Sequence, residues 1–383
     1  MWIAGTDGYK ASKAGELVNY HTTMGLAAVN RAVTLLSGMI STLPLDAYRS
    51  SPGGGLPVEI DPAPQLVRSP STVVSQRVWR TQLAISWLLW GNAYGLVMTR
   101  DREGWPTTVE WLDPSTVRAE QSASFRRPTF YINGSPANPD DLLHIPGIHV
   151  RPGHAVAAAP LETMKETFGL ALAARNFGSK WFGDGAHPSA ILSTDQVINS
   201  EQATAMKSRF TAALGGRREP AVLGAGIQYT PIQTPANESQ FLETQEAVTN
   251  DIARAFGLPV ETIGGSSGSS LTYANREQRS IDLLTYSVDP WLVALENDVY
   301  RDNLPGPQFV KVNRDALLRT DTMTRFKVHD MAIRGGMATV NERRRLEDLP
   351  PMEGGDELLW PPYTTVPYEG ELDLSAGDEG NEE

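Results

Sequence analysis

Two long amphipathic segments, residues 160–182 and 237–257, set the plan of this chain. Each carries apolar side chains at helical spacing, namely Leu170, Ala174, Phe177 and Trp181 in the first and Phe241, Val248, Ile252 and Phe256 in the second. If the first helix packs only against the second, its apolar stripe has no obvious partner within the same chain. We therefore expect neighbouring copies of the chain to pack against the first helix.

The ends and the interior of these two helices carry further signals. Gly169 and Gly178 lie inside the first helix, where a glycine costs about 1 kcal/mol relative to alanine. They predict the close approach of another helix. In the second segment Asn237 and Gln240 have the spacing of a capping box, and Gly257 marks the end of the helix.

The first 159 residues mix short strands with helices, and turn residues separate them. Helices are expected at residues 29–40 and 75–90, and strands at 43–49, 96–100, 107–112, 130–132 and 141–144. The module between the two long helices is expected to contain a strand at 189–193, a helix at 200–214 and strands at 221–223 and 227–233. The fold class is therefore α+β.

A Gly/Ser segment, residues 264–270, comes after the second long helix. A very long helix is predicted over residues 275–304, and Pro290 should kink it by removing a backbone hydrogen bond. A short strand at 309–312 and two helices within 319–349, joined at Gly335-Gly336, come next. The remainder is first Pro-rich and then acidic, which is typical of a tail.

Composition excludes several classes of function. The chain has no cysteine, which removes disulfides, thiolate metal sites, iron–sulfur clusters and cysteine nucleophiles. Its net charge is −12, but residues 353–383 hold ten acidic residues and no basic one. The rest is nearly neutral and lacks the basic stripe of a protein that grips nucleic acid. With no secretory signal and no run of about 20 apolar residues, we expect a soluble, cytoplasmic protein without membrane contact.

Catalytic and metal motifs are weak in this sequence. Gly264 to Gly268 fit the G-x-S-x-G pattern of a serine hydrolase centred on Ser266, but a helix precedes them where that motif requires a strand. His144, His149 and His154 lie on chain broken by Pro and Gly, so loop histidines are favoured over a metal site. No Gly-Lys dipeptide occurs, so the phosphate-binding P-loop is absent. We expect no metal and no cofactor.

Five arginines are candidate contacts. Arg217 and Arg218 lie on a predicted turn of the small module, while Arg254, Arg276 and Arg279 bracket the Gly/Ser segment. Solvated surface charges or salt bridges between subunits are one interpretation, and contact with a polyanion is the other.

The order of the elements resembles that of the portal proteins of tailed bacteriophages, specifically the compact family of long-tailed phages. The residues that carry the resemblance are Pro64 to Pro70, Trp90-Gly91-Asn92-Ala93-Tyr94-Gly95, Asp141 to Ile145, Ile252 to Pro259, Thr339 to Arg344 and Leu349-Pro350-Pro351. Each is weak alone, but their joint order over residues 26–356 is specific.

The resemblance implies a division of the chain into functional parts. These are an N-terminal wing part at 1–160, a first stem helix at 161–183, a clip at 184–236, a second stem helix at 237–258, a tunnel loop at 259–274, a second wing part at 275–318, crown helices at 319–352 and an acidic tail at 353–383. The family forms rings, and twelve copies are expected. Arg217 and Arg218 would belong to the motor-docking clip.

The resemblance also implies a function without enzymatic activity. The ring would be a DNA channel at one capsid vertex, used in genome packaging and ejection, with the terminase large subunit, the major capsid protein and a head–tail adaptor as partners. It would reside in the virion, and in the host cytoplasm during assembly. Duplex DNA would pass non-specifically along the tunnel loop, at Gly264, Gly265, Ser266, Ser267, Gly268, Ser269, Ser270 and Tyr273. The alternatives are the serine hydrolase and an oligomeric scaffold with no DNA role.

Overall fold

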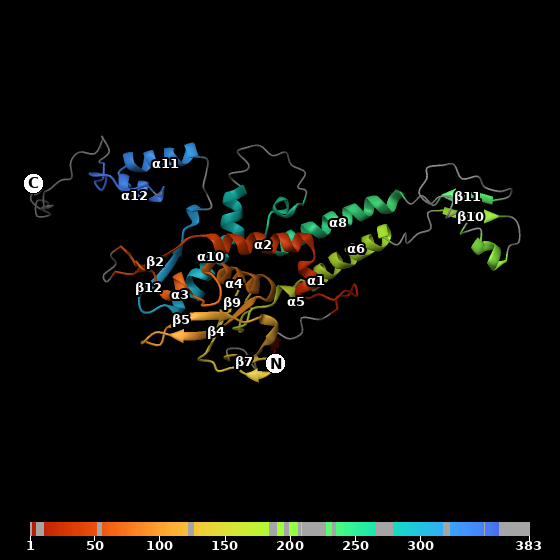
Figure 1. Ribbon diagram of the computed structural model, residues 1–383, viewed down its shortest axis with the longest axis horizontal. Helices are drawn as coiled ribbons and strands as arrows, with labels where there is room; N and C mark the ends of the chain where they lie inside the picture. Colours follow the sequence, from red (N-terminus) through yellow and green to blue (C-terminus); the bar gives the residue numbers. More distant parts are fainter. Residues whose placement is uncertain are drawn as a thin grey trace, which may run out of the picture. The chain divides into compact units, whose positions relative to one another are not determined.

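The computed structural model describes residues 2–4, 11–51, 56–121, 126–183, 190–194, 199–205, 208, 227–231, 235–265, 279–316, 322–347 and 349–359 (Figure 1). The chain divides into two units, Met1–Asn313 and Arg314–Glu383. None of the described helices is both long and apolar enough to cross a membrane.

Two packed helices form the centre of the first unit. The two predicted helices, α2 (Ala27–Thr42) and α4 (Gln76–Trp90), are present and lie against each other, and small helices α1 (Tyr20–Met24) and α3 (Gln65–Arg68) lie beside them. Their facing side chains are buried, namely Val29, Val33, Leu36, Ile40, Leu83 and Trp87. Ser75 caps the start of α4, and Gly91, with φ of +71°, ends it. A left-handed residue closes a helix with least strain when it is glycine.

Three small antiparallel sheets surround this centre. Strand β4 (Asn92–Arg100) lies between β5 (Pro106–Trp111) and β9 (Leu142–Pro146). The second sheet has the order β1 (Trp2–Ala4), β6 (Val117–Gln121), β7 (Thr129–Ile132) and β8 (Ser135–Pro136). In the third, β2 (Leu45–Arg49) lies between β12 (Gln308–Val312) and β3 (Val58–Glu59). Pairing of β12 with β2 therefore joins the two ends of the first unit.

The two long helices are present, with two corrections. The first is interrupted at Met164 into α5 (Pro160–Thr163) and α6 (Lys165–Gly183). The second, α8, spans Pro235–Ala255, so Asn237 lies inside its first turn and the predicted capping box is wrong. Proline starts the helix two residues earlier because its missing N–H needs no partner there.

The close approach that Gly169 predicts is real, but a different segment makes it. A Cβ on Gly169 would overlap the side chain of Ser12, which lies in the N-terminal segment and not on a helix. Helix α6 instead packs against α8, and Phe168 of α6 lies near Phe256, the residue just after α8, with ring centroids 6.3 Å apart. Between these helices in the sequence, β10 (Ala190–Thr194) and β11 (Ile227–Pro231) pair antiparallel, and the predicted strand at 221–223 lies outside the described residues.

The helical run around Pro290 is less regular than the sequence predicts. A π-helical turn (Leu283–Val288) precedes α10 (Asp289–Ala294), and a second π-helical turn (Leu295–Tyr300) comes after it. Pro290 therefore sits in the first turn of an α-helical piece, where a missing N–H is tolerated. The residues predicted to begin this helix, 275–278, lie outside the described part.

The second unit contains the two helices predicted around the glycine pair. They are α11 (Thr322–Arg334) and α12 (Val340–Leu346), and Gly336, with φ of +65°, forms the turn between them. A capping box of Thr339 and Glu342 starts α12. After α12 the chain turns back on itself, because the backbone N–H of Asn341 donates to the Gly355 carbonyl at 2.8 Å.

Candidate functional site

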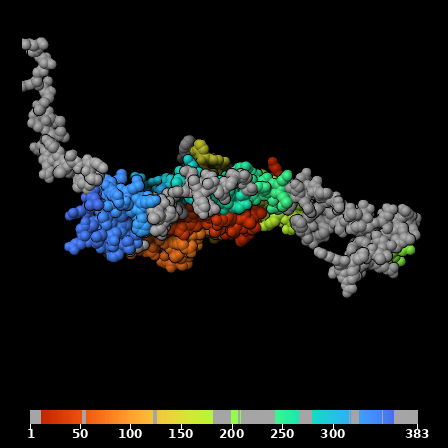
Figure 2. Space-filling model, turned by 90° about the horizontal axis from the view of Figure 1, so that it is seen from above, coloured from red at the N-terminus to blue at the C-terminus, as the bar shows by residue number. Residues whose placement is uncertain are grey.

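The base of the Gly/Ser segment begins where α8 ends. Gly257 has φ of +64°, and the N–H of Leu258 donates back to the Ala253 carbonyl at 2.9 Å, which closes the helix. The Ser287 hydroxyl donates to the Gly257 carbonyl at 2.5 Å and ties this turn to the π-helical run. The space-filling view shows α8, in green, beside α2, in red (Figure 2). Three elements thus hold the point from which the segment departs.

The next residues form a tight, close-packed turn. A 3-10 helix (Val260–Ile263) ends at Gly264, whose φ is +93°. A Cβ on Gly265 would lie 2.7 Å from Oδ1 of Asn250 and 2.9 Å from the Val260 carbonyl oxygen, so only glycine fits without displacement. Arg31 Nε also donates to the Thr262 carbonyl at 3.3 Å. The start of the predicted tunnel loop is therefore fixed by packing.

Two of the candidate arginines, Arg254 and Arg279, have acidic partners at this base. Arg254 pairs with Asp251 at 2.6 Å, and Arg279 pairs with Glu261 at 3.5 Å. Partly exposed pairs of this kind contribute only about 0–1 kcal/mol to stability. Their larger effect is to offset the positive charge of Arg254 and Arg279. The other candidate residues, Arg217, Arg218, Ser266, Ser267, Gly268, Ser269, Ser270, Tyr273 and Arg276, lie outside the described residues.

The geometry leading into Ser266 does not fit a nucleophile elbow. That motif places its serine directly after a strand, in a sharp turn. Here the preceding residues are the 3-10 helix (Val260–Ile263) and Gly264. The first requirement of the hydrolase interpretation is therefore unmet.

His144 and His149 have separate surroundings. Nε2 of His144 lies 3.0 Å from Oδ1 of Asn92, its ring stacks on Tyr94 with centroids 5.2 Å apart, and burial lowers its pKa to about 4. Burial also lowers the pKa of His149, which packs near Trp291. Within the described part of the chain, no three His, Cys, Asp or Glu side chains gather as a metal site.

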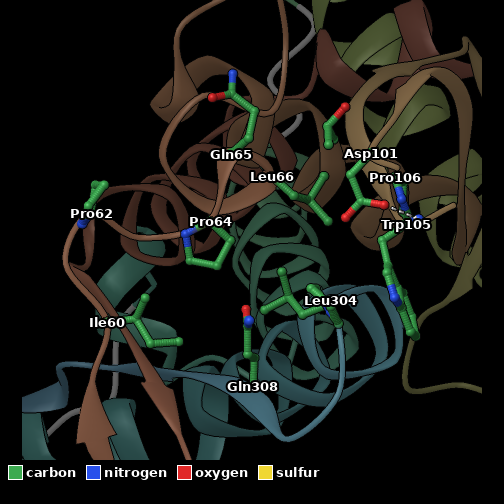
Figure 3. Close-up of a pocket in the computed structure, with 12 residues that line it drawn as sticks. Ile60, Pro62, Pro64, Gln65, Leu66, Asp101, Trp105, Pro106, Leu304 and Gln308 are labelled. Carbon is green, nitrogen blue, oxygen red and sulfur yellow. Dashed lines mark hydrogen bonds between the residues drawn. The ribbon is translucent and has the colours of Figure 1, made fainter. Parts of the chain in front are cut away.

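A cavity of about 340 Å³ opens in the first unit between α3, the β4–β5 turn and the start of β12 (Figure 3). Its lining is mostly apolar, with prolines, Leu66, Trp105 and Leu304. Asp101 is the carboxylate among its lining residues, and its Oδ1 already accepts the N–H groups of Glu103 and Trp105. The cavity therefore offers no pair of acidic groups for hydrolysis.

An uncovered apolar stripe runs along α6. Leu170 and Phe177 are 49% and 52% exposed, although Phe168 and Leu172 on the other side of the helix are buried against the chain. Leu242 on α8 is 67% exposed. The side chain of Trp181 lies outside the described part. This is the stripe that the sequence assigns to a neighbouring copy, and it is open in the single chain.

Comparison with known proteins decides what such a chain is. A family model described as "Phage portal protein" matches residues 27–348, most of the sequence. This chain belongs to the phage portal protein family. The family supports a structural role, as the sequence analysis expects.

The relatives agree with this assignment. A probable portal protein of Streptomyces phage phiC31 is 29% identical over 366 residues, covering 89% of this chain and 78% of that protein. The portal protein of Enterobacteria phage HK97 is 25% identical, covering 89% of this chain and 83% of that protein.

Solved structures share the portal fold. A HK97 family phage portal protein from Corynebacterium diphtheriae has a TM-score of 0.54 at 21% identity, covering 79% of this chain and 98% of that one. A chain from the neck of a native gene transfer agent (GTA) particle, computed with C12 symmetry, has a TM-score of 0.58 at 20% identity, covering 86% and 92%. The expected portal-type α+β fold is thus confirmed.

The portal fold gives physical reasons for the Trp90–Gly95 motif. A Cβ on Gly91 would meet the backbone of Ala158, and one on Gly95 would meet Val109 and Trp111. The hydrogen bonds of Asn92 could not be predicted from the sequence motif. Its amide donates to the Ala157 carbonyl and accepts from the Ala157 N–H, each at 2.9 Å.

Proposed function

We propose that this portal protein assembles into a closed ring, with twelve copies in the capsid, around a channel for duplex DNA. The ring occupies one capsid vertex, where a terminase motor loads the genome and a head–tail adaptor later docks. The neck structure computed with C12 symmetry, which shares this fold, supports a ring of that order. The sequence contains no phosphate-binding P-loop, which supports a separate motor as the source of energy for DNA movement.

The observation that carries the proposal is the open apolar stripe of α6. Leu170 and Phe177 are about half exposed although Phe168, Ala171 and Leu172 on the same helix are buried. Burying apolar surface contributes about 25 cal/mol per Å² removed from water. A head-to-tail contact that buries this stripe on each neighbour, and whose rotation closes, produces a ring.

The paired charges at the loop base support passage of DNA without tight binding. Duplex DNA carries one negative charge per about 1.7 Å, and unpaired arginines on a channel wall would hold it through counterion release. Arg254 and Arg279 are each neutralised by a carboxylate. A channel lined in this way lets the duplex slide and reads no bases.

The remaining parts of the chain follow the division that the resemblance implies. Residues 1–160 and 275–318 form the wing, 161–183 and 237–258 the stem, 259–274 the tunnel loop, 319–352 the crown and 353–383 a tail. The clip, residues 184–236, docks the motor and later the adaptor, with Arg217 and Arg218 at its turn. The wing meets the major capsid protein. The protein resides in the virion, after assembly in the host cytoplasm.

Electron microscopy of purified protein tests this proposal. We expect rings with an open axial hole for the native chain. The double variant Leu170→Asp, Phe177→Asp should give folded monomers, because both side chains are exposed in the single chain. Met98→Asp, also at an exposed apolar residue (55%), is the matched control and should retain rings.

Each alternative has its own outcome in this experiment. Rings without an axial opening would support a scaffold with no DNA role. Native protein that stays monomeric at assembly concentrations would overturn the ring.

A further inference from the structure

The N-terminal strap, as we call residues 11–19, lies along helix α6 (Figure 1). The strap folds back on itself, since Ala11 and Leu17 form an antiparallel bridge and the Ser12 N–H donates to the Glu16 carbonyl at 2.8 Å. The strap and α6 both belong to the first unit of the chain, so the structure shows how they pack.

Two polar contacts hold the strap on α6. The backbone N–H of Lys13 donates to Oε2 of Glu166 at 2.9 Å. Nδ2 of Asn176 donates to Oε1 of Glu16, also at 2.9 Å. From Glu166 to Asn176 the helix advances about 15 Å at 1.5 Å per residue, so the strap is held at two well-separated points.

Helix α6 has a notch at Gly169, and the strap fills it. A glycine inside a helix lowers the stability of that helix relative to alanine. Here a Cβ would overlap Oγ and Cβ of Ser12, a residue that is only 5% exposed. Only glycine therefore lets the strap dock at this position.

The strap lies beside the open apolar stripe of α6. Successive helical residues are about 100° apart, so two residues seven positions apart face nearly the same direction. Gly169 and Asn176 form one such row, which contacts the strap. Leu170 and Phe177 form the adjacent row, and both are exposed. The strap therefore borders the stripe along two turns of the helix.

The strap adds a third exposed apolar residue, Leu17, to this border. Leu17 is 42% exposed, whereas Val18 beside it is 3% exposed. Glu16, the residue before Leu17, contacts Asn176, the residue before Phe177. Leu17 therefore lies at the end of the stripe that Phe177 occupies. Single exposed leucines are common on proteins, but three neighbouring apolar residues from two distant segments form a patch that indicates an interface.

We propose that the N-terminal strap is part of the contact between neighbouring copies in the ring. Leu17, Leu170 and Phe177 form one apolar surface, which we call the composite surface, and a second copy of this chain covers it. The proposal rests on the ring of the proposed function. The neck structure with C12 symmetry, which shares this fold, supports a second copy as the occupant, because a closed head-to-tail ring gives every copy the same neighbour.

The docked strap makes Gly169 a determinant of assembly, although Gly169 is not on the composite surface. A side chain at this position displaces Ser12, and with it Leu17, while α6 stays helical. Loss of the strap should therefore weaken the ring even when the stripe of α6 is intact.

The first test changes Leu17 alone in the full-length chain. Leu17→Asp leaves the strap docked, because this side chain is exposed, and places an unpaired carboxylate against the neighbour. The concentration at which half of the chains are in rings, measured by sedimentation velocity, should rise at least about tenfold. Val73→Asp, at a residue 78% exposed before α4, is the matched control and should leave this concentration unchanged.

The second test displaces the strap and then restores it. Gly169→Ala should weaken ring formation by a similar factor, although alanine favours the helix. Adding Ser12→Gly removes the two overlapping atoms and leaves the Cα of residue 12 at 3.7 Å from the new Cβ, so rings should return. Adding Ser12→Ala keeps the overlapping Cβ and should not restore them. The single Ser12→Gly variant gives the reference value for the rescue.

Hydrogen exchange of residues 11–19 measures docking of the strap separately from assembly. In chains kept monomeric by dilution, the Lys13 N–H should exchange faster in Gly169→Ala than in the native chain, because it loses its bond to Glu166. Exchange should slow again when Ser12→Gly is added. Unchanged exchange in Gly169→Ala would show that the notch does not hold the strap, and would overturn its role in assembly.

The outcomes separate this inference from the proposed function. Native rings that persist equally in Leu17→Asp and Gly169→Ala would overturn the inference and leave the ring standing. Equal losses in Leu17→Asp and Val73→Asp would also overturn it, because added charge anywhere would then weaken the ring. Native chain that forms no rings would overturn both, while hydrogen exchange would still show the strap docked on α6.

Discussion

The base of the Gly/Ser segment and the end of α12 are built alike but differ in how their arginines are paired. In each, a helix is followed by a turn in which a glycine packs against an asparagine, Gly265 against Asn250 and Gly355 against Asn341. At the first site, Arg254 and Arg279 have carboxylate partners. At the second, Arg343, Arg344 and Arg345 have no carboxylate partner in the described residues. The comparison shows that the number of arginines says little about a surface until their partners are known.

The largest expected effect is a loss of folding stability as the pH falls. The two units should lose stability in different pH ranges. In the first unit burial holds the pKa of His144 at about 4, below its ordinary value of 6.5. The unfolded chain therefore binds a proton that the folded chain does not, and stability falls as the pH drops from 6.5 towards 4. The loss is up to about 3 kcal/mol at 1.36 kcal/mol per pKa unit.

Chemical denaturation of the first unit at pH 7 and pH 4.5 measures this loss. His144→Gln should flatten the pH dependence between these values, at some cost in stability at pH 7 because it disturbs the bond to Asn92. An unchanged pH dependence in that variant would assign the effect to other groups.

The second largest effect concerns the two glycines. Gly265→Ala places a Cβ 2.9 Å from a backbone oxygen, and Gly355→Ala places one 2.7 Å from Cγ of Asn341. Overpacking of this kind costs about 1–3 kcal/mol. We expect the Gly355 variant to destabilise α12 and its return segment, and the Gly265 variant to destabilise the end of α8.

Hydrogen exchange locates each loss. Gly38→Ala is the matched control, because nothing lies within 4 Å of the added Cβ. Exchange that rises equally in both units for either variant would show that the two sites are coupled.

The sequence predicted the main helices but not the strand pairings that hold the first unit together. In α2, α4, α6 and α8 the apolar residues recur at helical spacing because one face of each helix is buried. The sequence pattern therefore predicts these helices directly. The strand pairing of β12 with β2 joins residues far apart in the chain, and no local pattern encodes it. Strands β1 and β6 were missed for the same reason.

At the candidate site, the glycines were predicted and their supports were not. Gly264 and Gly265 belong to a visible Gly/Ser pattern. Arg31 and Ser287, which hold the turn through backbone carbonyls, carry no signal, because any arginine or serine looks the same in sequence. The same holds for the acidic partners of Arg254 and Arg279, which only the fold identifies.

The third effect is confined to the second unit. The hydrogen bond from His329 and the charge of Arg325 hold the pKa of Glu347 below its ordinary value of 4.5. Stability from this pairing is complete above 4.5 and is lost as the pH falls through the lower folded pKa. Thermal unfolding of α11 and α12, followed by hydrogen exchange between pH 5 and pH 3, should show this loss. Glu347→Gln should remove it, and Glu353→Gln, at an exposed residue, should not.

The smallest effect tests whether pairing is what keeps the loop base from binding DNA. Glu261→Gln removes the carboxylate that lies 3.5 Å from Arg279 and should add at most about one phosphate contact per chain. The slope of log affinity against log salt should then steepen by about 0.9 for each contact in a B-form duplex. Because one exposed ion pair is worth about 0–1 kcal/mol, we expect affinity for a random duplex to rise no more than about fivefold per contact. Glu59→Gln removes an exposed charge from β3 and should leave the slope unchanged. Equal slopes for both variants would mean that weak DNA binding at the loop base does not depend on the pair of Arg279 and Glu261. The contrast with the arginines at the end of α12 would then rest on the pair of Arg254 and Asp251 alone.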